Sequence, residues 1–463
     1  MSFTPMRTLT AALVLALAGS TLLACGDDEP ESNAKKITVW SLEDVADRVT
    51  ATRAIIADFT ARTGIQVELV TVNEDQFPSL IASSAAAGEL PDVVGSVSLA
   101  GIRTLAGNEL LHPDANGEIV QTLGRQTFSA RALELTADDG RQLAVPSDGW
   151  GQLLVYRKDL FDAAGLPAPD TYERIAAAAA RLNTGGTAGI TAATAPGDVF
   201  TQQTFEHLAL ANGCQLTDDS GAVTLDSPQC VEAFRFYGDL MRDHSVKGAQ
   251  DVDTTRATYF AGKAAMLIWS PFILDELAGL RNDAKPTCPQ CAADPAFLAK
   301  NSGFVTAIKG PNGSPAQYGE ISSWAVLDGA AADPAKSFVE YLLGDAYPRW
   351  FGMSPEGRFP VRKGTADEPE KFLTAWNTSQ AGVDAKKPLA EVYGDQVLDA
   401  LRASPDAFQR WGLAQGQGKL VGAILGELPV PKALNDVIAG KSDAAAAAGR
   451  AKKDVEAIKA GVN

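Results

Sequence analysis

In the first hundred positions, apolar residues are spaced in two ways, one typical of β-strands and one typical of α-helices. Short apolar stretches rich in β-branched residues predict buried strands, which lie at 36–41 (KITVWS), 65–72 (IQVELVTV) and 91–97 (PDVVGSV). Between the first two strands, Ile55, Ile56, Phe59 and Ile65 are spaced for one buried helical face. A second helix is predicted over 77–87, where Gly88 ends it. Strands that alternate with helices predict an α/β protein with a mostly parallel sheet.

The segment 140–161 (GRQLAVPSDGWGQLLVYRKDLF) breaks this alternation. It contains two extended stretches separated by a predicted turn at Pro146–Gly149, and we interpret it as a crossing between two lobes. Residues 163–299 are mostly helical by pattern, and one helix is predicted to be capped by Ser227 with Pro228 at its first position. Later elements are predicted at 302–310 (strand), 321–329 (strand), 334–343 (helix) and from Ser442 onward (helix).

This order predicts two α/β lobes built from discontinuous segments. Each lobe is expected to hold a mostly parallel sheet flanked by helices, with hinge crossings between them. We place the N-terminal lobe at 37–147 plus 302–352 and the C-terminal lobe at 148–301 plus 353–463.

The N-terminus has the pattern of an export signal. A weakly positive start with Arg7 precedes the apolar run 9–23, which is short for a membrane span and is followed by acidic residues. The alternative is a buried N-terminal helix. Leu22-Leu23-Ala24-Cys25 resembles a bacterial lipobox, which implies a signal peptide at 1–24, a lipidated Cys25 and a flexible tether at 25–36. The protein is therefore expected outside the cytoplasmic membrane, anchored to it by lipid.

Charge narrows the choice of partner. The formal net charge of −17 opposes binding to phosphate backbones and to anionic lipid surfaces, so nucleic acid and direct membrane adhesion are not expected.

The four remaining cysteines are an even number in an oxidising compartment. Cys214 and Cys230 flank a predicted hairpin, and a disulfide there would close its loop. Cys288 and Cys291 have CxxC spacing, so metal and redox roles compete with a disulfide in a local loop. His112, His207 and His244 are scattered, and no second CxxC offers further ligands, so we expect a disulfide and no metal or cofactor.

Catalytic fingerprints are missing: the sequence contains no GxSxG, HExxH, GxxxxGK[ST] or GxGxxG. Tryptophans next to polar residues are more informative, because a sugar ring offers an apolar face for stacking and hydroxyls for carboxylates. Trp40 ends the first strand, Trp150 follows Asp148 in the crossing, and Trp269 follows a later strand. Trp324 lies within a strand, where core packing is expected.

Four motifs in order resemble the extracellular sugar-binding proteins of bacterial ABC importers, the maltose-binding-protein-like family. The motifs are ITVWS with FTARTGIQVELV and AAGELPDVV, then VPSDGWGQLLVYRKDLFDAAGLPAPDTYERI, YFAGKAAMLIWSPF and SPEGRFPVRKG. The resemblance covers nearly all of 36–458. It implies a monomeric two-lobe protein, not an enzyme, that closes on a carbohydrate and delivers it to the transmembrane subunits of an ABC permease.

Positions matched to the family imply a set of ligand-binding residues at loops that face the other lobe. They are Trp40, Glu43, Asp44, Ser96, Ser98, Asp148, Trp150, Trp269, Phe272, Tyr318 and Glu320, with Asp75 and Arg358 as further candidates.

Two other functions remain open. A lipid-anchored glycoside hydrolase would use two carboxylates, with candidates at Glu43–Asp44, Asp75, Asp148 and Asp275–Glu276. A binding protein of similar fold for a non-sugar or phosphorylated solute would use Arg358 and Arg362 to hold an anion.

Overall fold

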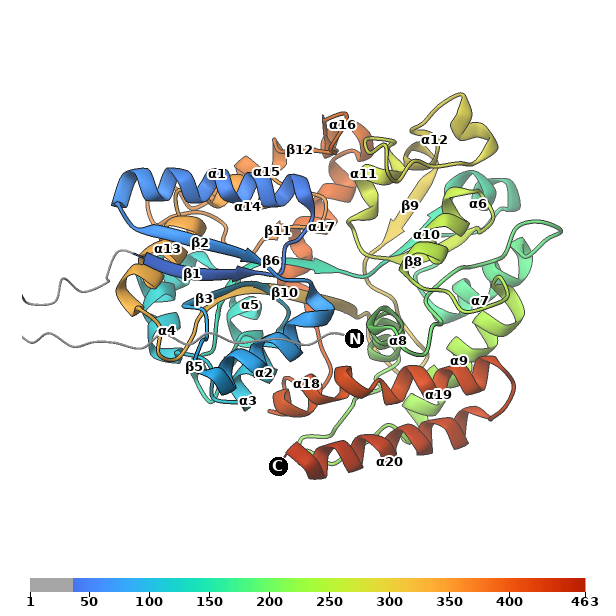
Figure 1. The fold of residues 1–463 in the computed structure, drawn as a ribbon. Helices are drawn as coiled ribbons and strands as arrows, with labels where there is room; N and C mark the ends of the chain where they lie inside the picture. The colour runs from blue at the N-terminus through green and yellow to red at the C-terminus, as the bar shows by residue number, and fades with distance from the viewer. Residues whose placement is uncertain (1–35, 463) are drawn as a thin grey trace, which may run out of the picture. The chain divides into compact units, whose positions relative to one another are not determined.

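The larger of the two main sheets has seven strands and lies on the N-terminal side of the fold (Figure 1). The structure is a computed structural model that describes residues 36–462, so the predicted signal peptide, Cys25 and nearly all of the tether lie outside the described residues. The strands of this sheet are β1 (Lys36–Ser41), β2 (Gln66–Thr71), β3 (Val93–Val97), β6 (Val145–Gly151), β10 (Gln317–Val326), β11 (Phe359–Pro360) and β14 (Phe408–Gln409). Their spatial order is β11-β6-β10-β3-β1-β2, and β14 pairs with the start of β10.

Helices cover both faces of this sheet. Val93 and Val94 are neighbours on β3 but enter two different apolar clusters, because successive strand residues point to opposite faces. The surrounding helices are α1 (Ala46–Thr63), α2 (Phe77–Ala87), α3 (Leu99–Gly107), α4 (Pro113–Thr122), α5 (Ala130–Leu135), α13 (Ala332–Leu343) and α14 (Tyr347–Phe351). Short elements connect them: the 3-10 helices η1 (Glu74–Gln76) and η2 (Arg125–Thr127), and the hairpin of β4 (Ala137–Asp138) with β5 (Arg141–Gln142).

The smaller sheet has the order β8-β7-β9. Its strands are β7 (Leu153–Arg157), β8 (Met266–Trp269) and β9 (Ser302–Val305). Around it lie α6 (Lys158–Ala164), α7 (Tyr172–Leu182), α8 (Val199–Ala211), α9 (Pro228–His244), α10 (Val252–Phe260), α11 (Ile273–Leu277), η3 (Pro289–Ala292) and α12 (Phe297–Lys300). Residues of both sheets, such as Val39 and Val155, belong to one continuous apolar core.

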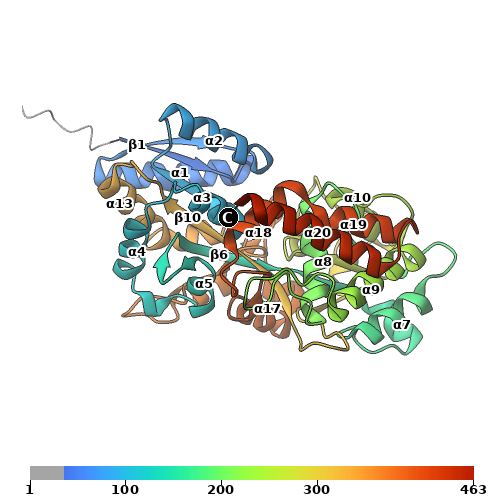
Figure 2. The same cartoon turned by 90° about the horizontal axis from the view of Figure 1, so that it is seen from below.

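The C-terminal part of the chain is helical, apart from β14 and the pair β12 (Gln380–Ala381) and β13 (Lys387–Pro388). Its helices are α15 (Lys371–Asn377), α16 (Leu389–Tyr393), α17 (Asp395–Ala407), α18 (Gly418–Glu427), α19 (Pro429–Ile438) and α20 (Ala444–Val462). Helix α18 packs on α3, while α19 and α20 pack on α9, so this layer reaches from one sheet's helices to the other's (Figure 2). Within residues 36–462, no helix combines the length and the apolar composition that crossing a membrane requires.

The α/β architecture is confirmed, but the expectation that the strands of each sheet run mostly parallel is wrong. Strand β1 is parallel to β2 and β3, whereas β10 is antiparallel to both β3 and β6. In the smaller sheet β7 is antiparallel to β8 and β9. The reason is that β6 carries the chain out of the larger sheet and β10 brings it back, so these neighbours must run in opposite directions.

The predicted turn at Pro146–Gly149 is also wrong, because β6 runs through it without a break. Strand β6 pairs with β10 on one side and with β11 on the other, and Asp148 and Gly149 take part in both pairings. Pro146 sits where the register against β10 shifts, so its missing N–H disturbs the ladder little. The chain crosses to the smaller sheet at Gln152, between the end of β6 and the start of β7.

Strand pairing also assigns four segments differently from the sequence-based lobe boundaries. Asp148–Gly151, β11 and β14 pair within the larger sheet, and Ser302–Val305 pair within the smaller one. Other local predictions are confirmed: Ser227 caps α9 with Pro228 in its first turn, and Trp324 is buried within β10. Both disulfides, Cys214–Cys230 and Cys288–Cys291, are formed.

Candidate functional site

The directions of the strands bring the predicted ligand-binding loops to the crossing between the sheets. Strands β3 and β6 are both antiparallel to β10, and β1 is parallel to β3, so all three end at the edge where the chain leaves for β7. In the smaller sheet, Trp269 at the end of β8 lies opposite Leu153, the first residue of β7. The loops after β1, β3 and β8 therefore meet near the crossing, which is where α/β proteins commonly bind ligands.

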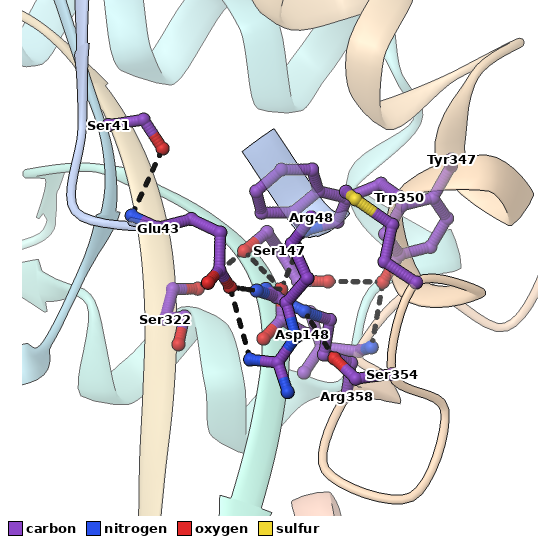
Figure 3. A network of polar contacts seen from close by, with 12 residues as sticks. Ser41, Glu43, Arg48, Ser147, Asp148, Ser322, Tyr347, Trp350, Ser354 and Arg358 are labelled. Atoms are coloured by element: carbon purple, nitrogen blue, oxygen red, sulfur yellow. Dashed lines mark hydrogen bonds and ion pairs between the residues drawn. The ribbon is translucent and has the colours of Figure 1, made fainter. Parts of the chain in front are cut away.

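One buried network joins three of the predicted residues, and Figure 3 shows Glu43 and Asp148 converging on Arg358. Glu43 follows β1, Asp148 lies in β6, and Arg358 directly precedes β11. Arg358 forms an ion pair with Glu43, and its Nη1 lies 3.4 Å from Asp148 Oδ1. All three side chains are buried.

Further contacts complete this arrangement. The Trp350 ring centroid lies 4.5 Å from the guanidinium carbon of Arg358. The indole Nε1 of Trp350 donates to Asp148 Oδ1 at 2.8 Å. Arg358 Nε donates to Ser354 Oγ at 3.0 Å. Burial alone would lower the pKa of Arg358, but the nearby carboxylates outweigh it and raise that pKa. We call Glu43, Asp148, Trp350, Ser354 and Arg358 the Arg358 network.

A second network links the two sheets through residues far apart in the chain. Arg410 follows β14, and its Nη1 lies 2.6 Å from Glu320 Oε2 on β10, while its Nε lies 3.1 Å from Glu206 Oε1 on α8. Glu320 Oε1 also accepts from the backbone N–H of Leu99, at the start of α3, at 2.7 Å. The Tyr318 ring lies 4.7 Å from the Arg410 guanidinium. We call Glu206, Tyr318, Glu320 and Arg410 the Arg410 network.

Burial shifts the pKa of Glu206 and of the residue next to it in this second network. It raises the pKa of Glu206 against the opposing effect of Arg410, and it lowers the pKa of the neighbouring His207 to about 3. His207 therefore stays neutral, and its Nδ1 accepts from the backbone N–H of Tyr318 at 3.1 Å. Sequence reasoning missed Glu206 and Arg410, because no local pattern distinguishes them from surface charges.

Five predicted residues keep part of their surface exposed near the crossing: Trp40, Ser96, Ser98, Trp150 and Phe272. The Trp150 ring is tilted against Tyr318, with centroids 6.0 Å apart. Ser98 caps α3 by accepting from Gly101 N. Trp269, in contrast, is buried and packs edge-on against Phe200 at 4.8 Å.

Ser96 has the least ordinary backbone among the predicted residues. Its φ is +59°, in the left-handed region that non-glycine residues rarely occupy, and its buried Oγ has no hydrogen-bond partner among the described residues. Ser96 lies where the register between β3 and β10 shifts. At the preceding Gly95, the Trp324 ring lies 2.3 Å from where a Cβ would be. Strain and an unpaired hydroxyl at one position are typical of binding sites.

The two remaining predicted acids are Asp44 and Asp75. Asp44 is exposed, and its Oδ2 accepts from Asn73 Nδ2 at 3.1 Å. Asp75 lies in η1. The ligand-binding role of the whole set stays a prediction.

The contacts weaken the two alternatives from the sequence. Glu43 and Asp148 both bind the Arg358 guanidinium, so neither is free to act as the proton donor that a glycosidase needs. Arg358 is thereby neutralised, and Arg362 is enclosed by Phe128 and Phe372 and donates to Leu123 O at 2.7 Å. Neither guanidinium is free to hold a phosphate. Within residues 36–462, no cluster of acids, histidines and cysteines could hold a metal ion.

Two surface cavities lie elsewhere. One of about 610 Å³ lies between the α3–α4 region and the start of α18, and one of about 330 Å³ lies beside α17. Neither is lined by any of the predicted ligand-binding residues.

Residues 44–347 match the family model described as bacterial extracellular solute-binding protein. The chain belongs to this family. It is 28% identical over 324 residues to "Putative ABC transporter periplasmic-binding protein YcjN" of Escherichia coli (strain K12), an alignment that covers 67% of this chain and 70% of that protein.

Solved structures share the fold. The maltose-bound MalE3 of T. maritima superposes with a TM-score of 0.67 at 18% identity, covering 91% of this chain and 99% of that one. An ABC transporter solute-binding protein of Thermotoga lettingae bound with α-D-tagatose gives a TM-score of 0.69 at 20% identity, covering 92% and 99%. The fold of this solute-binding protein is therefore the two-lobe fold of periplasmic binding proteins, with one sheet in each lobe.

Proposed function

We propose that this protein is the solute-binding component of an ABC importer that captures a carbohydrate, a mono- or oligosaccharide, between its two lobes. The observation that carries the proposal is the partly exposed rings of Trp40, Trp150 and Phe272 near the crossing, together with Ser96 on β3, whose hydroxyl has no hydrogen-bond partner among the described residues. Rings of this kind stack on sugar faces, and buried hydroxyls pair with sugar hydroxyls. The relatives named above, two of them solved with sugars, support it.

The charges support an uncharged solute over an anionic one. Arg358 and Arg410 each contact two carboxylates, so the charge of each of these two buried guanidinium groups is already neutralised. A phosphate or carboxylate would have to displace one of these acids, leaving it buried without a partner at a large cost. Sugar hydroxyls require no such displacement.

Closure follows from binding to both lobes. A solute that contacts loops of the larger and the smaller sheet favours the closed arrangement by its differential affinity for that state. The lobe boundaries 37–147 plus 302–352 and 148–301 plus 353–463 remain our proposal, with four strand segments reassigned to the sheets in which they pair. Asp148–Gly151, β11 with the loop before it, and β14 go to the larger sheet, and β9 goes to the smaller one.

Delivery completes the proposed cycle. The closed protein docks, as a monomer and without catalysing a reaction, on the transmembrane subunits of a permease. Cleavage after residue 24 and acylation of Cys25 would hold it at the outer face of the membrane, with 25–36 as the tether.

A thermal-shift screen tests the carbohydrate assignment. The chain from Gly26 onward is heated with mono- and oligosaccharides, and with the phosphate of each monosaccharide as its matched anionic partner. A solute at about a thousand times its dissociation constant stabilises the folded state by about 4 kcal/mol, which raises the melting temperature by several degrees. We expect neutral sugars to give the shift; shifts from sugar phosphates only, or from no carbohydrate, would contradict the proposal.

A further inference from the structure

Three buried carboxyl groups form an acidic cluster, and the proposed function does not use it. Asp275 and Glu276 lie on α11, and Glu356 lies in the loop between α14 and β11. Their exposed fractions are 2%, 8% and 2%. One oxygen of each, Asp275 Oδ1, Glu276 Oε2 and Glu356 Oε2, is buried without a hydrogen-bond partner among the described residues. A buried carboxylate with an unpaired oxygen is destabilised relative to its protonated form.

The neighbouring cations do not remove this imbalance. Arg256 pairs with Glu276 through its other oxygen at 3.1 Å, and also with Asp253. Arg281 pairs with Asp283 at 2.9 Å, and Arg48 lies 3.4 Å from Glu43. The charged and titratable groups that act on the cluster are Arg48, Arg256, Arg281, Asp283, Arg358 and Tyr393.

The hydroxyl of Tyr393, on α16, does not supply the missing hydrogen bond. It donates instead to the backbone oxygen of Leu274. Protonation of the carboxyl groups would reduce the charge of the cluster and remove the cost of an unpaired carboxylate oxygen.

The cluster forms where the two lobes touch. Helix α11 directly follows β8 of the smaller sheet, whereas Arg48 begins α1 and Glu356 precedes β11, both of the larger sheet. The Arg48 guanidinium lies over the Phe272 ring at 5.2 Å. The same ring fills the space beside Gly357, where a Cβ would lie 2.3 Å from it. Separating the lobes at this contact would expose Asp275 and Glu356 to water.

We propose that formation of this lobe contact takes up a proton at the Asp275–Glu356 carboxyl pair, so that closure, and with it solute capture, strengthens as the pH falls. The claim that solute capture strengthens at low pH rests on the proposed function. The claim that the lobe contact takes up a proton does not, because it follows from the burial of these carboxyl groups between the two lobes.

The direction of the effect follows from the pKa values. Burial raises the pKa of Asp275 to about 6 and that of Glu356 to about 8, and the nearby Asp275 carboxyl group raises the pKa of Glu356 further. Burial also raises the pKa of Glu276 to about 7. An exposed carboxyl group titrates near 4. The closed contact therefore binds protons that the open form releases, so it is favoured at low pH and weakens as the pH rises through about 6 to 8.

The lobe contact can be tested without a solute. Small-angle scattering of the chain from Gly26 onward gives the radius of gyration between pH 5.5 and pH 8.5. We expect a smaller radius at pH 5.5 in the wild-type protein. The variants Asp275→Asn and Glu356→Gln mimic the protonated groups, so each should hold the compact value at higher pH. Glu340→Gln, on α13 and away from the contact, is the control and should behave like the wild type, although burial also raises the pKa of Glu340.

Two results would overturn the proposal: a radius that does not change with pH in the wild type, or an equal change in wild type and both variants. The effect on capture is measured with maltose and D-tagatose as probes, whichever of them shifts the melting temperature. One proton taken up on binding tightens the dissociation constant up to about a hundredfold from pH 8 to pH 6. If neither sugar binds while the radius still follows pH, the carbohydrate assignment is at fault and the proton-linked contact stands.

Discussion

Replacing Arg358 by methionine is expected to destabilise the protein far more than replacing an exposed arginine. The substitution leaves Glu43 and Asp148 buried without their shared cation. Removing one partner of a buried ion pair costs about 3–5 kcal/mol. Glu43 would keep Arg48, and Asp148 would keep the Trp350 indole and the Ser147 hydroxyl. We therefore expect the lower end, a loss of about 3 kcal/mol of unfolding free energy.

The matched control is Arg349→Met. Arg349 is 45% exposed and pairs with Asp58 at 3.2 Å, so its loss should change stability by less than about 1 kcal/mol. Urea unfolding at pH 8, followed by far-UV circular dichroism, measures both variants. Equal stability of the two variants at pH 8 would refute the buried network.

Three further predictions use other parts of the molecule. Trp150→Ala should weaken binding of the sugar found in the screen by about 1–3 kcal/mol with little change in melting temperature, as calorimetric titration would measure; unchanged affinity would remove Trp150 from the site. Replacing both Cys214 and Cys230 by serine should lower stability by about 3 kcal/mol in the chain-entropy model, whereas a loss below about 0.5 kcal/mol would mean that the disulfide contributes little. Cys25→Ser should move the protein, expressed with its full N-terminus, from the detergent phase to the aqueous phase in Triton X-114 partitioning; detergent partitioning of the variant would argue against a lipid on Cys25.

Local sequence signals predicted most elements of the fold. Helix α2 spans the predicted 77–87, and α13 begins two residues before the predicted Pro334. These elements are predictable because apolar spacing, caps and glycines act within a few residues. The error at Pro146–Gly149 has the opposite cause: strand partners more than 150 residues away keep this turn-like sequence extended.

The site was predictable only in part. The family resemblance named Glu43, Asp148 and Arg358 one by one, but their mutual contact depends on how distant strands and loops pack. The same holds for Glu206 and Arg410, which are 204 positions apart and yet share a buried ion pair. Such partners have no sequence pattern, because their geometry arises only once the two sheets are assembled.

Hydrogen exchange with and without the stabilising sugar tests the central claim, capture between the lobes, most directly. The proposal predicts slowed exchange at loops of both lobes, at 40–44 and 96–98 after β1 and β3 and at 150–152 and 269–272 around the start of β7 and the end of β8. Protection confined to one sheet, or found only beside the two outlying cavities, would contradict it.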